Sequence, residues 1–149
     1  MRDVYKPLDR LLSQTVILRD GFRCRRCERG PQSRIDKSRG VVLQAAHIYG
    51  KGAHPAMRYD LRNVICLCKG CHFRWWHKTG HEAAPTNEVR EWCEQNLGIE
   101  HMEMLDLIAQ STKGKGKPLD FSATWLMLET EIRRLTRTPA SEGFSESPG

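Results

Sequence analysis

Two Cys-x-x-Cys pairs constrain this chain more than any other feature: Cys24 with Cys27, and Cys68 with Cys71. A Cys-x-x-Cys turn directs both thiolates to one side, and two such turns complete the tetrahedron that zinc prefers. The 40 residues between the pairs are too many for a simple zinc ribbon, but they suit two turns joined by a hairpin. A redox dithiol or unrelated buried cysteines are the alternatives, yet a redox motif occurs once and beside a βαβ pattern. The pairs therefore predict structural Zn²⁺.

The segments around the cysteines predict the elements that carry them. Apolar residues at mixed spacings of three and four in 8–17 predict an amphipathic helix, with Gly21 to end it. The β-branched and apolar run 41–48 predicts a strand, and 61–68 predicts the returning strand. Residues 69–80 predict a short helix. The fold class that follows is α+β, a small zinc-stapled core with the order helix, knuckle, β-hairpin, helix.

The composition of the sequence changes after Gly80, and we divide the chain into three parts on this basis. Residues 1–80 form the zinc module, 81–138 a helical C-terminal extension, and 139–149 a tail whose composition is typical of disorder. The extension contains an acidic helix with Thr86 or Asn87 as its N-cap, a second short helix, and a strong amphipathic helix over 118–138.

The charge and hydropathy of the sequence indicate which classes of binding partner the protein can have. Residues 1–80 carry 17 Lys and Arg against 6 Asp and Glu, a net charge of +11, whereas residues 81–149 carry a net charge of −5. The basic half is the half with the zinc ligands, which favours a polyanion such as DNA over a merely solvated face. No apolar run is long enough for a membrane span, and the N-terminus lacks the apolar block of a signal peptide. We expect a cytoplasmic protein; its oligomeric state stays open.

Three polar residues fall at defined points of the predicted hairpin: His47 near the end of the first strand, Asn63 at the start of the second, and His72 directly after Cys71. With the two cysteine pairs, they resemble the HNH endonucleases, whose site is called ββα-metal. The resemblance covers about Arg19 to Gly80. The stretch "AAHIYGKGAHPAMRYDLRNV" further resembles phage recombination nucleases of the NinG kind, which implies a phage- or bacterium-encoded protein.

The resemblance implies a hydrolase that cuts phosphodiester bonds in duplex or branched DNA and leaves a 3′-hydroxyl and a 5′-phosphate. His47 would be the general base, since an imidazole can be neutral near pH 7. Asn63 would orient that ring or tie the loop by hydrogen bonds. His72 would bind a catalytic divalent ion (Mg²⁺, Mn²⁺, Zn²⁺ or Ni²⁺) that stabilises charge on the leaving oxygen.

The chain departs from the family pattern at Ala46, where many members carry Asp or His as a second metal ligand. His77 is the natural replacement, because some relatives use a second histidine in the helix. His54 and Asp60 are weaker candidates. If none of them serves, the alternative is a catalytically inactive zinc-stapled DNA-binding module. A zinc-dependent protein-interaction module is a third possibility.

Four basic residues near the predicted site are candidates for phosphate contacts, although a solvated face explains each one alone equally well. They are Arg58, Arg62, Arg74 and Lys78. The neighbouring Trp75 and Trp76 are expected to pack around the helix rather than to stack on bases.

Overall fold

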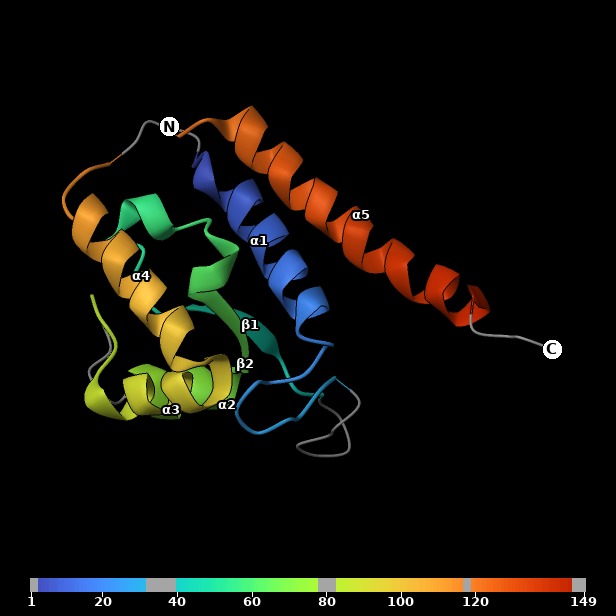
Figure 1. Cartoon of the computed structure of the whole chain (residues 1–149), viewed down its shortest axis with the longest axis horizontal. Helices are drawn as coiled ribbons and strands as arrows, with labels where there is room; N and C mark the ends of the chain where they lie inside the picture. The colour runs from blue at the N-terminus through green and yellow to red at the C-terminus, as the bar shows by residue number, and fades with distance from the viewer. Residues whose placement is uncertain (1–2, 32–39, 78–82, 117–118, 146–149) are drawn as a thin grey trace.

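The computed structural model describes residues 3–31, 40–77, 83–116 and 119–145, with side chains described as far as residue 137. Five α-helices surround one two-stranded sheet (Figure 1). The elements in chain order are α1 (Tyr5–Arg19), β1 (Leu43–His47), β2 (Val64–Cys68), α2 (Lys69–Cys71), α3 (Asn87–Leu97), α4 (Ile99–Thr112) and α5 (Phe121–Ser145). Short 3-10 turns span Pro55–Met57 and Leu61–Asn63, and a π-helical turn spans His72–His77. The α+β class is confirmed.

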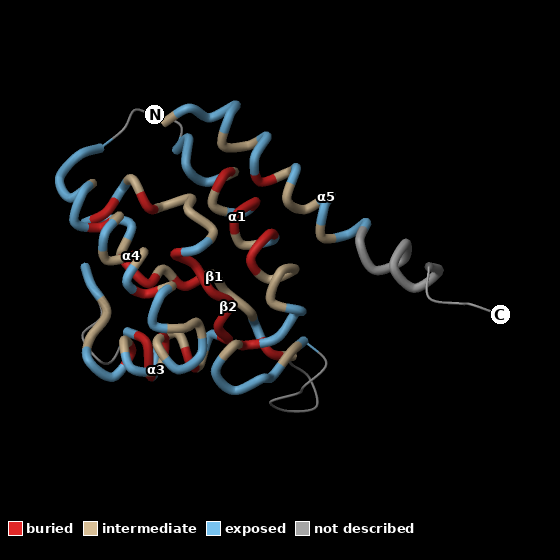
Figure 2. Tube along the Cα trace, viewed as in Figure 1, coloured by how far each residue is buried: buried red, intermediate tan, exposed pale blue. Residues whose placement is uncertain are grey.

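The β-hairpin lies at the centre of the fold. Its antiparallel register pairs Leu43 with Cys68 and His47 with Val64. Every residue of β2 is buried, because helices cover both faces of the sheet (Figure 2). Val64 and Cys66 pack toward α1 and Leu128 of α5, whereas alternate residues of the strand join a second cluster with α3 and α4.

Helix α1 forms as its apolar spacing predicts. Leu8, Leu11, Leu12 and Val16 are all buried. The helix ends where Gly21 adopts a φ of +73°, the left-handed conformation expected there. Its outer side lies along α5, which continues past the end of α1 (Figure 1).

The segment after β2 is helical, but it is not one regular helix. Cys68 caps α2, since its sulfur accepts a hydrogen bond from the Cys71 amide at 3.3 Å. The chain then widens into the π-helical turn, where Trp75 and Trp76 are buried, as expected for packing residues. The indole nitrogen of Trp76 donates to the carbonyl of His47 at 3.2 Å, which fixes the π turn against β1.

The C-terminal helices share their core with the hairpin. Asp106 of α4 accepts hydrogen bonds from Tyr49 in the hairpin loop and from Arg90 of α3. Thr86 is the N-cap residue of α3, but no side-chain capping bond is recorded for it. Helix α5 runs to Ser145, so the helical backbone extends into 139–149, the range assigned to a tail. None of the helices, over the ranges described above, has the length and apolar character to span a membrane.

Candidate functional site

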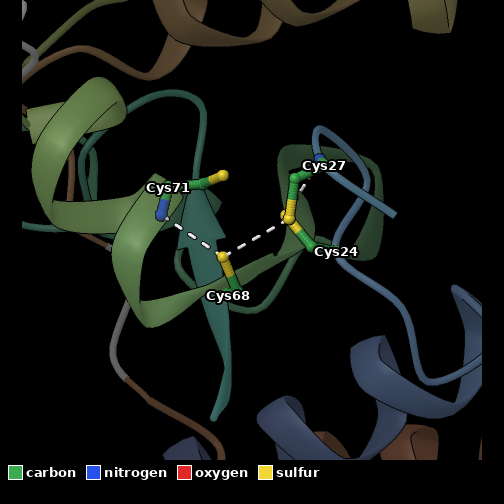
Figure 3. Close-up of side chains that lie close together, drawn as sticks. All are labelled: Cys24, Cys27, Cys68 and Cys71. Atoms are coloured by element: carbon green, nitrogen blue, oxygen red, sulfur yellow. Dashed lines mark hydrogen bonds between the residues drawn. The ribbon is translucent and has the colours of Figure 1, made fainter. Parts of the chain in front are cut away.

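Two turns of the chain bring the four cysteines together. The amide of Cys27 donates to the sulfur of Cys24 at 3.5 Å, which repeats the bond between Cys71 and Cys68 at 3.3 Å. The first turn is attached to the sheet by a hydrogen bond of 2.9 Å from the Arg25 amide to the Cys66 carbonyl. Figure 3 shows the sulfur atoms of both turns facing a common centre.

The cluster has the geometry of a structural zinc site. All four sulfur atoms lie within 4.8 Å of one another, and those of Cys27 and Cys68 are 3.7 Å apart. Four sulfurs placed 2.3 Å from a central Zn²⁺ would be separated by about 3.8 Å. Within the described part of the chain, no other group of three or more His, Cys, Asp or Glu side chains is placed to hold a metal ion. The prediction of a four-cysteine zinc site agrees with this geometry.

The four clustered cysteines can all be thiolates only if a cation balances their charge. Burial and the hydrogen bond with Cys68 raise the pKa of Cys71 to about 12 in the metal-free chain. The guanidinium of Arg26 lies 3.9 Å from the Cys71 sulfur and 4.2 Å above the Trp75 ring. One arginine cannot balance four thiolates, whereas Zn²⁺ deprotonates the thiols it binds. The other two cysteines, Cys66 and Cys93, are buried outside the cluster.

A separate cavity of about 450 Å³ gathers the histidines that the sequence singled out. His47, His72 and His77 all line it, although they come from β1 and from the π turn on the other side of the hairpin. Helix α1 closes one wall with Asp9, and the loop after β1 contributes Lys51. The imidazole of His47 therefore opens into the same space as those of His72 and His77, which lie 25 and 30 residues further along the chain.

The orientation of His47 suits proton abstraction. Its Nε2 lies 2.9 Å from the carbonyl oxygen of Arg58, which can only accept, so in the neutral ring Nε2 carries the proton and Nδ1 carries the lone pair. Burial lowers the pKa of His47 below 6.5, and the charges of Lys51 and Arg58 lower it further, against the opposing effects of the same carbonyl and of Asp9. The ring is thus neutral at neutral pH.

His72 and His77 meet at their Nε2 atoms, which are 3.1 Å apart. Gln44 contacts the other ring nitrogen of His72, since its Oε1 lies 2.9 Å from His72 Nδ1. This contact places the proton on Nδ1 and directs the Nε2 lone pair toward His77. Two nitrogens bound 2.0–2.1 Å from one metal ion lie about 2.9–3.4 Å apart. The two rings hydrogen-bond to each other at 3.1 Å, a separation that also lies within the range for two adjacent ligands.

The π turn is what brings this pair together. In an α-helix, residues five positions apart point about 140° away from each other. A π-helix closes its hydrogen bonds between residues five apart, so His72 and His77 fall on the same side.

Asn63 ties the loop of the hairpin. It is fully buried, and its Oδ1 accepts a bond of 2.8 Å from the Tyr49 amide. Its Nδ2 donates to the carbonyls of Tyr49 at 2.9 Å and Met57 at 3.2 Å. The amide thus clamps both ends of the loop that follows His47, whereas Asn63 is not among the residues that line the cavity.

The position of the family's second metal ligand, Ala46, and the two weaker candidates for that ligand, His54 and Asp60, lie outside the histidine cavity. Ala46 is fully buried in the hydrophobic core, between Ala45 and His47, which both line the cavity. His54 is also buried, with its ring edge-on to Tyr49. Asp60 caps the turn at Leu61–Asn63 and pairs with Arg62. None of the three lines the histidine cavity.

The basic residues proposed for phosphate contacts are in different settings. Arg58 forms a two-pronged ion pair with Asp9, at 2.6 and 3.2 Å, and lies over the Tyr5 ring. Arg62 is paired with Asp60 at 2.8 Å on another face. Arg74 is exposed, and Lys78 lies outside the described residues.

Sequence reasoning did not identify Asp9 and Gln44, which are 38 and 3 residues from His47. Asp9 fixes Arg58, whose carbonyl holds His47, and Gln44 sets the tautomer of His72. The position of Gln44 three residues before His47 in the predicted strand was the only signal available. Compared with known proteins, the chain matches no family model, no curated protein and no solved structure.

Proposed function

We propose that the chain is a metal-dependent DNA endonuclease of the HNH type. The observation that carries this proposal is the single cavity shared by His47, His72 and His77, in which the Nε2 atoms of the last two are 3.1 Å apart. In this proposal one histidine serves as the base and two as metal ligands, which are the groups that phosphodiester hydrolysis requires.

The chain's own groups divide the reaction between them. Nδ1 of His47 takes the proton from a water molecule, whose oxygen attacks the phosphorus while the bond to the 3′ oxygen breaks. The carbonyl of Arg58 holds the ring in the tautomer that this transfer needs. His72 and His77 would hold a divalent ion, which would supply charge stabilisation at the leaving oxygen. Lys51, at the rim of the same cavity, offers a positive charge to the phosphate.

The experiment is nicking of supercoiled plasmid by zinc-loaded protein, with Mg²⁺, Mn²⁺, Zn²⁺ or Ni²⁺ added after a brief chelator wash. We expect metal-dependent nicking that His47→Ala abolishes. His101→Ala is the matched control, because His101 binds a carbonyl oxygen in the same way but lies on α4, outside the cavity. Nicking that survives in His47→Ala would remove this base assignment.

One observation favours the alternative of a catalytically inactive zinc-stapled DNA-binding module. No third His, Cys, Asp or Glu joins His72 and His77 among the described residues, so this part of the chain supplies two ligands to the ion. This function predicts salt-sensitive DNA binding with no nicking under any of the four metals.

A further inference from the structure

A second cavity, of about 510 Å³, lies beside the first on the other side of the π turn. Its apolar wall includes Val42, just before β1, and Phe73 of the π turn, whose side chains are 55% and 56% exposed. Single exposed apolar residues are ordinary, but here two of them face the same hollow. We call this hollow the Phe73 groove.

Every charged residue that lines the Phe73 groove in the described part of the chain is positive. Arg29, Lys69 and Arg74 line it and are exposed, and no Asp or Glu is among its described lining residues. None of the three has an ion-pair partner within the described part of the chain. This differs from Arg58 and Arg62, whose charges are already neutralised by Asp9 and Asp60. Three cations without an ion-pair partner among the described residues therefore line this one groove.

The Phe73 groove adjoins the histidine cavity. The centroid of the Phe73 ring lies 5.9 Å from that of His72 and 6.0 Å from that of His77. A strand whose phosphate sits at the two histidines therefore has an aromatic ring next to it, and that ring belongs to the groove that the three cations line.

We propose that the Phe73 groove binds an unpaired DNA strand, with a base stacked on Phe73 and the flanking phosphates contacted by Arg29, Lys69 and Arg74. An apolar wall with a cationic rim fits the two parts of a nucleotide, and single-strand sites combine stacking aromatics with a positive groove. Paired bases in a duplex are stacked on their neighbours and do not offer a face to the ring. Where it makes unpaired DNA the substrate of the histidine site, this inference rests on the proposed nuclease function.

The test is fluorescence anisotropy of zinc-loaded protein without added divalent ions, using labelled oligothymidine of about 20 nucleotides, the same length of abasic strand, and a duplex. Phe73→Ala is expected to weaken binding of oligothymidine by about 5- to 100-fold and to leave binding of the abasic strand unchanged. Phe73→Tyr should restore binding. Phe22→Ala is the matched control, because Phe22 is 51% exposed but does not line the groove.

The contribution of the three cations is measured separately, from the salt dependence of DNA binding. Replacing Arg29, Lys69 or Arg74 by Gln should each reduce the slope of log Kobs against log[salt] by about 0.7. Equal binding of wild type and Phe73→Ala to oligothymidine, or binding of duplex as tight as of single strand, would overturn the inference.

The two proposals fail separately. Loss of nicking in every metal, with Phe73-dependent binding intact, removes the nuclease and retains the groove as a binding site. Metal-dependent nicking together with binding that is insensitive to Phe73 and to the three cations retains the nuclease and removes the groove.

Discussion

The Nε2 atoms of His72 and His77 lie 3.1 Å apart because the chain between them is a π-helical turn rather than an α-helix. If the pair holds the divalent ion, His77→Ala should raise the concentration of Mn²⁺ needed for half-maximal nicking by at least ~10-fold, since even outer contacts to a metal site are worth 10- to 100-fold. The measurement is the nicking rate against Mn²⁺ concentration. An unchanged half-saturation, as expected for the His101→Ala control, would remove His77 from the ligand set.

Gln44 should act through His72 rather than on the DNA. Its Oε1 lies 2.9 Å from His72 Nδ1, so Gln44→Ala frees the ring to turn and to take the other tautomer. We expect an affinity for Mn²⁺ that is lower by about 10- to 100-fold, with the maximal rate at saturating Mn²⁺ largely kept. Gln44→Glu retains an acceptor and should recover most of that affinity. Equal losses in both variants would indicate a packing role instead.

The pH dependence of nicking should report His47. Burial and the nearby Lys51 and Arg58 lower the pKa of this ring below 6.5. The base is active when neutral, so kcat/KM should be level at neutral pH and fall tenfold per unit only below a midpoint that is itself under 6.5. The profile is measured at two saturating Mn²⁺ concentrations. A midpoint that moves with Mn²⁺ would assign the acid limb to the metal ligands rather than to His47.

The parts of the site that sequence could predict are those that follow from local spacing. The Cys-x-x-Cys turns and the two strands of the hairpin depend on residues close together in sequence, and they appear as expected. Contacts across the fold follow no such spacing: Arg58 and Asp9 are 49 residues apart, and their pairing depends on how α1 packs on the sheet. The sequence could not predict the π turn at His72–His77 either. The turn depends on how Trp75 and Trp76 are buried against the rest of the fold, which local spacing does not reveal.

Removal of the zinc should unfold the module. Cys27 is exposed, so Cys27→Ser loses a ligand with little loss of packing and isolates the contribution of the metal. Structural zinc contributes about 10–16 kcal/mol in small zinc domains, which is as large as the 5–15 kcal/mol by which whole domains are stable. We expect loss of bound zinc and of the cooperative thermal transition. Cys93→Ala, at a cysteine outside the cluster, should keep one zinc per chain, and a folded, zinc-free Cys27→Ser would contradict the structural role.

Asn63 should matter for the loop rather than for the chemical step. Asn63→Ala removes the partner of the Tyr49 amide and of the Tyr49 carbonyl in a buried setting, and each such group costs about 1–3 kcal/mol. The Met57 carbonyl keeps a second bond, from the Asp60 amide at 3.3 Å. We therefore expect a loss of at least ~2 kcal/mol in the free energy of unfolding, measured by urea titration at constant m-value. Asn96→Ala is the control, because its single bond to the Trp92 carbonyl is exposed. Activity should fall with the folded fraction. A variant of Asn63 that keeps full stability but loses nicking would instead place the amide in direct contact with the reaction.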